Sequence, residues 1–205
     1  RDSSDRRFHL IALARNEQGR IALNKIITKS NLENFYYKPR VQISDIAPYA
    51  DDLIITSACL ASKIAREEDY QKCIEYIKEY KKVFPHFFLE MQSHNTTDQK
   101  VYNLKVLKLS KDYKGFIYPT FGFHPVSSQN ATEQDLKTAH ENIKKYLNDI
   151  VAIGEVGMDY FYVTDKALRE RQQEIFTSFL NLANDSLTAS CPIFSIGFCT
   201  VVKEG

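Results

Sequence analysis

The chain has 205 residues, of which 43% are hydrophobic and 26% charged, and its 27 basic and 26 acidic residues leave a net charge of +1. This balance excludes a strongly basic protein of the kind that binds nucleic acid through its overall charge, and no apolar stretch is long enough to cross a membrane. The four cysteines form no CxxC pair and no secretory signal is recognisable, so we expect a reducing, cytoplasmic location.

Apolar runs of strand length alternate with amphipathic stretches of helix length along the chain. The predicted strands are residues 8–15, 53–56, 87–91, 116–121, 150–153 and 191–202. The predicted helices are residues 16–30, 69–83, 97–112, 132–147 and 164–183, with Asn16, Asp69, Thr96 or Thr97, and Thr132 near their starts. This alternation predicts an α/β fold with parallel strands, in the form of a partial or composite (β/α) barrel.

The stretch DIVAIGEVGMD, residues 149–159, is the centre of the functional prediction. Its β-branched run ends at Gly154, so Glu155 is expected at the carboxyl end of a buried parallel strand, where α/β proteins hold their chemistry. A carboxylate in this place is suited to binding a metal or acting as a general base. The alternative is a strand-end glutamate that pairs with a nearby lysine or arginine.

Other polar residues are expected at strand carboxyl ends, namely Cys59, Gln92 with His94, and His124. The proline after His124 extends the chain and so orients the imidazole ring. Cys59 fits either a metal thiolate or a small buried apolar residue. His9 lies near the start of its strand, where a core histidine is commoner than a ligand. Together these residues form a His, Glu and Cys set suited to a divalent metal and phosphate oxygens.

Four stretches of the first half follow one another as FHLIALARNEQG, NFYYKPRV, LIITSACLASKIA and FFLEMQSHN. In this order and spacing, residues 8–113 resemble the PHP domain of the bacterial replicative DNA polymerase III α subunit. The resemblance implies that His9 and Cys59 belong to a multi-metal cluster. The family's opening HxH motif, its early Asp and Glu and its closing Asp-x-His are absent, and Ser62-Lys63 stands where Gly-Glu is usual.

Two stretches of the second half are IYPTFGFHP and VAIGEVGMDYFYVTDKALRERQQEIFTSFLNLAN. They look like the strand ending in GxHP and the GE-x-G-x-D segment of TatD-type metal-dependent deoxyribonucleases, so residues 117–184 resemble that family. The resemblance implies that Glu155 binds metal, that His124 lies in the active site and that Asp159 supports it. The family's initial HxH, later histidines and final catalytic Asp are missing, and Gly197 stands near the place of an expected histidine.

These resemblances divide the chain into a PHP-like β/α segment at residues 1–114, a TatD-like β/α segment at residues 115–184, and an unmatched tail at residues 185–205 that reads like a frameshift. A chain joined in this way is a natural recombinant, an engineered chimera or an assembly artefact.

Three hypotheses for function follow. The first is a hydrolase, a phosphoesterase or deoxyribonuclease that cuts DNA or another phosphoester with a divalent metal (Zn, Mn or Mg, expected from the resemblance) and has an incomplete site. His124 and Asp159 would be catalytic, and Glu155, His9 and Cys59 would bind the metal. The second is a non-catalytic PHP segment of a replicative DNA polymerase that contacts partner subunits. The third is a composite chain with no evolved function.

Overall fold

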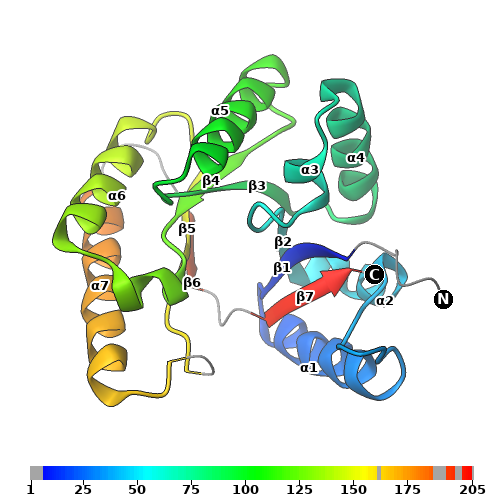
Figure 1. Ribbon diagram of the computed structural model, residues 1–205. Coiled ribbons are helices and arrows are strands. Elements are labelled where there is room, and N and C mark those ends of the chain that lie inside the picture. Colours follow the sequence, from blue (N-terminus) through cyan, green and yellow to red (C-terminus); the bar gives the residue numbers. More distant parts are fainter. Residues whose placement is uncertain (1–6, 161–162, 187–192, 197–199, 205) are drawn as a thin grey trace. The chain divides into compact units, whose positions relative to one another are not determined.

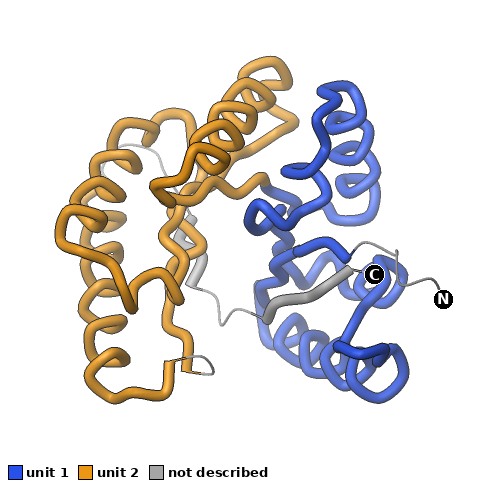
Figure 2. The backbone as a smooth tube through the Cα atoms, in the orientation of Figure 1, with its two compact units in different colours: residues 1–88, 199–205 blue, residues 89–198 orange. Residues whose placement is uncertain are grey.

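The computed structural model describes residues 7–160, 163–186, 193–196 and 200–204. The chain divides into two compact units, with residues 1–88 and 199–205 in unit 1 and residues 89–198 in unit 2 (Figure 2). Strand β3 (Phe87–Gln92) spans the division, because Phe87 and Phe88 belong to unit 1 and the rest of the strand to unit 2.

The strands of unit 1 are not all parallel. Strand β1 (Phe8–Ala14) pairs antiparallel with both β2 (Leu53–Thr56) and β7 (Thr200–Glu204), whereas β2 pairs parallel with the start of β3 (Figure 1). The prediction of parallel strands is therefore wrong for β1. The sequence pattern of a strand carries no direction, and only the pairing partner decides it.

The two long helices of unit 1 begin where their capping residues predict. Asn16 accepts a hydrogen bond from the Gly19 N–H at the start of α1 (Glu17–Leu32), and Asp69 caps α4 (Tyr70–Val83). Three short elements were not predicted, because each is too short to show a helical period: α2 (Ile43–Ile46), the 3₁₀ helix η1 (Ala47–Asp52) and α3 (Lys63–Arg66).

The core of unit 1 lies between its helices and strands. Its fully buried side chains from α1, β1, β2, α4 and the start of β3 include Leu10, Ile26, Leu53, Ile55, Ile77 and Phe87. The ring of Tyr80 on α4 stacks on Phe87, with ring centroids 5.0 Å apart. Cys73 on the same helix is fully buried.

Unit 2 contains parallel strands: the last four residues of β3, then β4 (Pro119–Gly122), β5 (Ala152–Val156) and β6 (Ile193–Ile196). Strand β4 begins later than predicted, because the N–H groups of Phe116 and Ile117 both turn back to the Tyr113 carbonyl. The single strand predicted at residues 191–202 is wrong, since β6 and β7 are separate. Gly197 lies outside the described residues.

The helices of unit 2 are α5 (Thr97–Asp112), the 3₁₀ helix η2 (Pro125–Asn130), α6 (Glu133–Lys145) and α7 (Lys166–Ser186). Thr96 caps α5, and Thr132 caps α6 in a capping box with Asp135. The ring of Phe123, just after β4, stacks on Phe179 of α7 at 5.7 Å between centroids.

The α/β class with mostly parallel strands is confirmed, and the repeated strand–helix order is that of a partial (β/α) barrel. Among the described residues, no helix combines the length and the apolar character that a membrane span requires.

Candidate functional site

Strands β4 and β5 are in close backbone contact at Gly122 and Glu155. A β-carbon at position 122 would overlap the backbone of Gly154 and Glu155, whose shared peptide bond is cis. The Phe123 N–H, one residue further on, donates a hydrogen bond of 2.9 Å to the Glu155 carbonyl. Glycine is therefore required at position 122 for the two strand ends to meet.

The side chains of His124 and Glu155 meet at this junction. His124 Nε2 lies 3.8 Å from Glu155 Oε2, and the Glu155 side chain is only 4% exposed whereas that of His124 is 29% exposed. The register of β5 against β6 shifts between Ile153 and Val156, an irregularity of the kind that re-aims side chains beside active sites. The structure thus places Glu155 within β5 rather than after it, and brings it to His124.

The tautomer of His124 follows from its backbone contact. The Val126 N–H donates a hydrogen bond of 3.2 Å to His124 Nδ1, so this nitrogen must be the unprotonated acceptor. In a neutral imidazole the proton then lies on Nε2, on the side of Glu155. The ring can therefore donate a hydrogen bond to an anionic oxygen at the site.

Asp159 lies in the loop after β5, and its backbone is held by α7. The Asp159 N–H donates to Gln172 Oε1 at 3.0 Å, and Gln172 Nε2 donates to the Pro125 carbonyl at 3.0 Å. Gln172 is 1% exposed. One buried amide therefore joins the loop of Asp159 to the residue that follows His124. Sequence reasoning did not identify Gln172, because a glutamine on a long helix carries no local signal.

His9 and Cys59 form a second pair, within unit 1. His9 Nδ1 lies 3.3 Å from Cys59 Sγ, and the His9 N–H donates to the Ala61 carbonyl. The antiparallel pairing of β1 with β2 explains this contact. Ile11 is opposite Thr56, so the start of β1 lies beside the carboxyl end of β2, where Cys59 follows.

A chain of hydrogen bonds runs along β3 from a buried carboxylate. Gln92 Nε2 donates to Glu90 Oε1 at 2.6 Å, and His94 Nε2 lies 3.1 Å from Gln92 Oε1. Ser127 Oγ lies 3.5 Å from His94 Nδ1, and burial lowers the pKa of His94 below its ordinary value. Glu90 is fully buried and was not singled out from the sequence. The alternation of FFLEMQ, which puts Glu90 and Gln92 on one face, could have identified it.

The described side chains do not form a complete metal site. Among them, no three or more His, Cys, Asp or Glu residues gather in a way that could hold a metal ion. Zinc sites use at least three protein ligands. Each of the two pairs, His124 with Glu155 and His9 with Cys59, supplies only two donors. The donor types suit a divalent metal, but their number in either pair does not.

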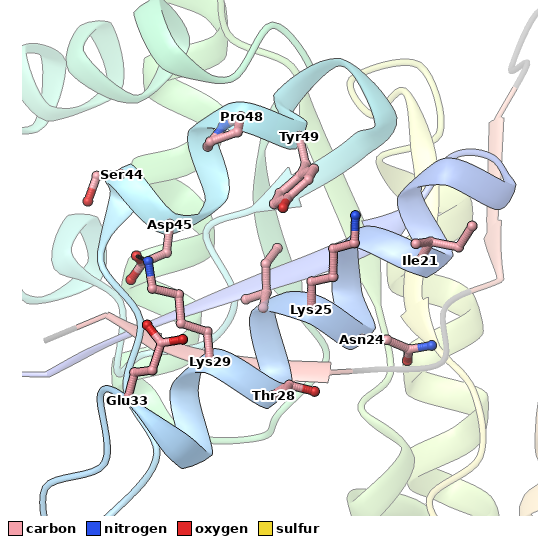
Figure 3. A pocket seen from close by; sticks show the side chains of 11 residues that line it. Ile21, Asn24, Lys25, Thr28, Lys29, Glu33, Ser44, Asp45, Pro48 and Tyr49 are labelled. Carbon is pink, nitrogen blue, oxygen red and sulfur yellow. Dashed lines mark ion pairs between the residues drawn. The ribbon is translucent and has the colours of Figure 1, made fainter.

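A pocket of about 510 Å³ lies elsewhere in unit 1, between α1 and the α2–η1 segment (Figure 3). Lys29 forms an ion pair of 2.7 Å with Asp45 there, and Lys25 lies over the ring of Tyr49. None of the residues predicted to carry chemistry lines this pocket. Its size therefore gives no support to the predicted site.

Two family descriptions match the sequence. TatD related DNase matches residues 56–193, which is more than half of the chain, and PHP domain matches residues 1–94. The two matched ranges overlap on residues 56–94. Both predicted resemblances are therefore confirmed.

Individual relatives fall into the same two groups. The DNA polymerase III subunit alpha of Borreliella burgdorferi is 37% identical over 133 residues, which cover 63% of this chain and 12% of that protein. The corresponding subunit of Aquifex aeolicus is 30% identical over 126 residues, covering 60% of this chain and 11% of that protein. A Danio rerio protein named "Putative deoxyribonuclease tatdn3" is 35% identical over 88 residues, covering 40% of this chain and 33% of that protein. The chain thus spans a third or less of each of these relatives.

Proposed function

The chain belongs to the TatD related DNase family, and we propose that it carries a phosphodiester-hydrolase site built on His124 and Glu155. The observation that supports this proposal most directly is the 3.8 Å approach of the His124 imidazole to the buried Glu155 carboxylate. His124 follows β4 and Glu155 lies near the end of the neighbouring parallel strand β5, at the edge of the sheet where α/β enzymes bind their substrates.

The two side chains have different roles in the proposed reaction. His124 donates its Nε2 proton in a hydrogen bond to a non-bridging phosphate oxygen, because its Nδ1 is already occupied by the Val126 N–H. Through one carboxylate oxygen, Glu155 accepts a proton from the attacking water, whose oxygen bonds to phosphorus. The bond between phosphorus and the leaving oxygen breaks, and the leaving oxygen takes up a proton from solvent. Asp159 supports the site from the neighbouring loop, where Gln172 holds its backbone. The substrate class is DNA or another phosphodiester.

Metal dependence is general in both matched families. As the metal ligands that this chain offers we propose Glu155 in unit 2 and, separately, His9 and Cys59 in unit 1. Because the described residues supply too few donors for a complete site, we expect weak hydrolysis from this chain alone. In the described part of the chain, Cys59 and Cys73 form no disulfide, which fits the reducing conditions of a cytoplasmic protein.

The test combines elemental analysis with a cleavage assay on the full chain. Zinc, manganese and magnesium are measured in the purified protein, and cleavage of a fluorescent oligonucleotide is followed with each metal added. Glu155→Gln keeps the size of the side chain and removes its charge, so cleavage should fall at least about a hundredfold, the lower end of the effect of losing a general base. Glu141→Gln, on the exposed face of α6, is the matched control.

Two results would contradict the proposal. One is cleavage by Glu155→Gln at the rate of the unaltered chain, and the other is no cleavage by the unaltered chain under any metal condition. Unfolding curves of the variants distinguish a chemical effect from loss of the fold.

A second candidate function rests on the PHP match and the polymerase relatives. In this proposal, residues 8–113 form a non-catalytic PHP segment that contacts subunits of a replicative DNA polymerase. It predicts that metal content and cleavage are both absent, and that the chain associates with purified polymerase subunits. Size-exclusion chromatography of such mixtures decides between this candidate and a chain with no evolved function.

A further inference from the structure

The end of α1 and the segment between α1 and α2 carry an unusual concentration of exposed apolar side chains. Four of the eight large hydrophobic residues exposed in the described part of the chain lie between residues 27 and 37: Ile27, Leu32, Phe35 and Tyr37. Phe35 is 55% exposed and Tyr37 is 81% exposed, so their rings face solvent. We call residues 33–42 the aromatic loop.

Cations accompany the rings of the aromatic loop. The Arg40 guanidinium lies 4.8 Å from the centre of the Tyr36 ring, and the rings of Tyr36 and Tyr37 meet edge to face at 4.6 Å. Lys38, which lies between Tyr37 and Arg40 in the sequence, is exposed. Tyr37 has a φ of +57°, a conformation that non-glycine residues adopt uncommonly, and the surrounding contacts must maintain it.

One carboxylate closes the base of the aromatic loop. Asp45 accepts hydrogen bonds from the Asn34 side chain at 2.9 Å and from the Gln42 N–H at 2.8 Å, and it forms an ion pair with Lys29 of α1. The first two contacts join the beginning of the loop to its end. The tip is therefore presented from a fixed base, which reduces the conformational entropy lost when a ligand binds.

We propose that the aromatic loop binds single-stranded DNA through Phe35 and Tyr37, with Lys38 and Arg40 beside the phosphates. Exposed rings provide flat faces on which unpaired bases stack, and cations next to the rings complement the charged backbone. In a duplex the base faces are already covered by their neighbours, so this surface favours a single strand. A protein partner would use the apolar faces but would gain less from the two cations.

This inference goes beyond the proposed hydrolase. The aromatic loop lies in unit 1 and contains none of the residues of the His124 and Glu155 pair, so binding is measurable without cleavage. The test uses fluorescence anisotropy of a fluorescein-labelled oligothymidylate with the full chain in EDTA, which prevents metal-dependent cleavage.

Stacking of bases on the two rings predicts how much affinity is lost when the rings are removed. The double variant Phe35→Ser/Tyr37→Ser should bind at least about tenfold more weakly, because each stacked base contributes substantially to affinity. Tyr37→Phe should restore most of the binding lost in Tyr37→Ser, since the ring face is retained. Lys38→Gln should weaken binding and reduce its dependence on salt.

Matched controls separate this surface from general effects. Leu104→Ser removes an equally exposed apolar side chain from α5, and Lys78→Gln removes an exposed charge from α4, and both should leave the affinity unchanged. All of these positions are exposed, so thermal unfolding should be little altered. Three results would each overturn the proposal. They are an affinity of the double variant equal to that of the unaltered chain, tighter binding of duplex than of single-stranded DNA, and no binding of the oligonucleotide.

Discussion

Gly122 packs directly against the backbone of Glu155, with no room for a β-carbon between the two strands. We predict that Gly122→Ala destabilises the protein by about 1–3 kcal/mol, the usual cost of overpacking a closely packed interior. Separation of the strands should also move His124 away from Glu155. Urea denaturation measures the free energy of unfolding. Gly115→Ala is a useful comparison, because its β-carbon has open space and only the positive φ opposes it.

Gln172 is expected to stabilise the two loops that it joins. Gln172→Met keeps the length of the side chain but leaves the Asp159 N–H and the Pro125 carbonyl without their buried partner, at a cost of about 1–3 kcal/mol. Gln173→Met, at the exposed neighbouring position, is the control and should change stability by less than about 0.5 kcal/mol. Equal stability of the two variants in urea denaturation would show that the amide contributes nothing.

Asp45 should contribute to stability in a pH-dependent way. Burial alone raises the pKa of its carboxyl, but the hydrogen bonds from Lys29, the Gln42 N–H and the Asn34 side chain together lower the pKa below its ordinary value. A lowered pKa gives stability that is present above the ordinary pKa of an aspartate and is lost as the pH falls through the lowered value.

We therefore predict that Asp45→Asn destabilises the protein by roughly 1–3 kcal/mol at neutral pH, and that the difference shrinks below about pH 4. Denaturant titrations over a series of pH values measure this difference. Asp98→Asn, an exposed aspartate in the first turn of α5, is the control. A difference that stays constant down to acidic pH would contradict the role of the Asp45 charge.

His140 predicts a second pH dependence, near neutrality. Burial and, to a smaller extent, Lys144 lower the pKa of His140, whose ring meets Phe179 edge to face and whose Nε2 lies 3.2 Å from Ser178 Oγ. The unfolded chain therefore binds this proton more tightly, so stability falls as the pH drops below the ordinary pKa of histidine.

His140→Gln should lose most stability relative to the unaltered chain at pH 8, and the gap should narrow toward pH 5.5, values chosen to lie on either side of the ordinary histidine pKa of about 6.5. The pKa values of His86 and His94 are also lowered, so the stability of the variant should still fall to some extent as the pH drops. Thermal unfolding across this pH range measures both profiles. If the stability of the variant and that of the unaltered chain changed with pH in the same way, His140 would be excluded as a source of the pH dependence.

Local patterns in the sequence were sufficient for most of the elements. The caps at Asn16, Asp69 and Thr132 lie where helices begin, because a cap contacts N–H groups only two or three residues away. Local patterns do not show which face of α5 is buried. Its apolar positions Val101 and Leu104 are both 61% exposed, since contacts elsewhere decide which face of a helix is buried.

By itself, the sequence determined the α/β class, the order of the main elements and the two families, because each of these is encoded in short stretches. Only the tertiary structure decided that β1 runs antiparallel to β2 and so brings His9 to Cys59, that Gly122 allows Glu155 to reach His124, and that Glu90 and Gln172 are buried partners of polar neighbours. The physical reason is that these contacts join residues far apart in the chain, where strand direction and close packing, rather than local preference, decide which side chains meet.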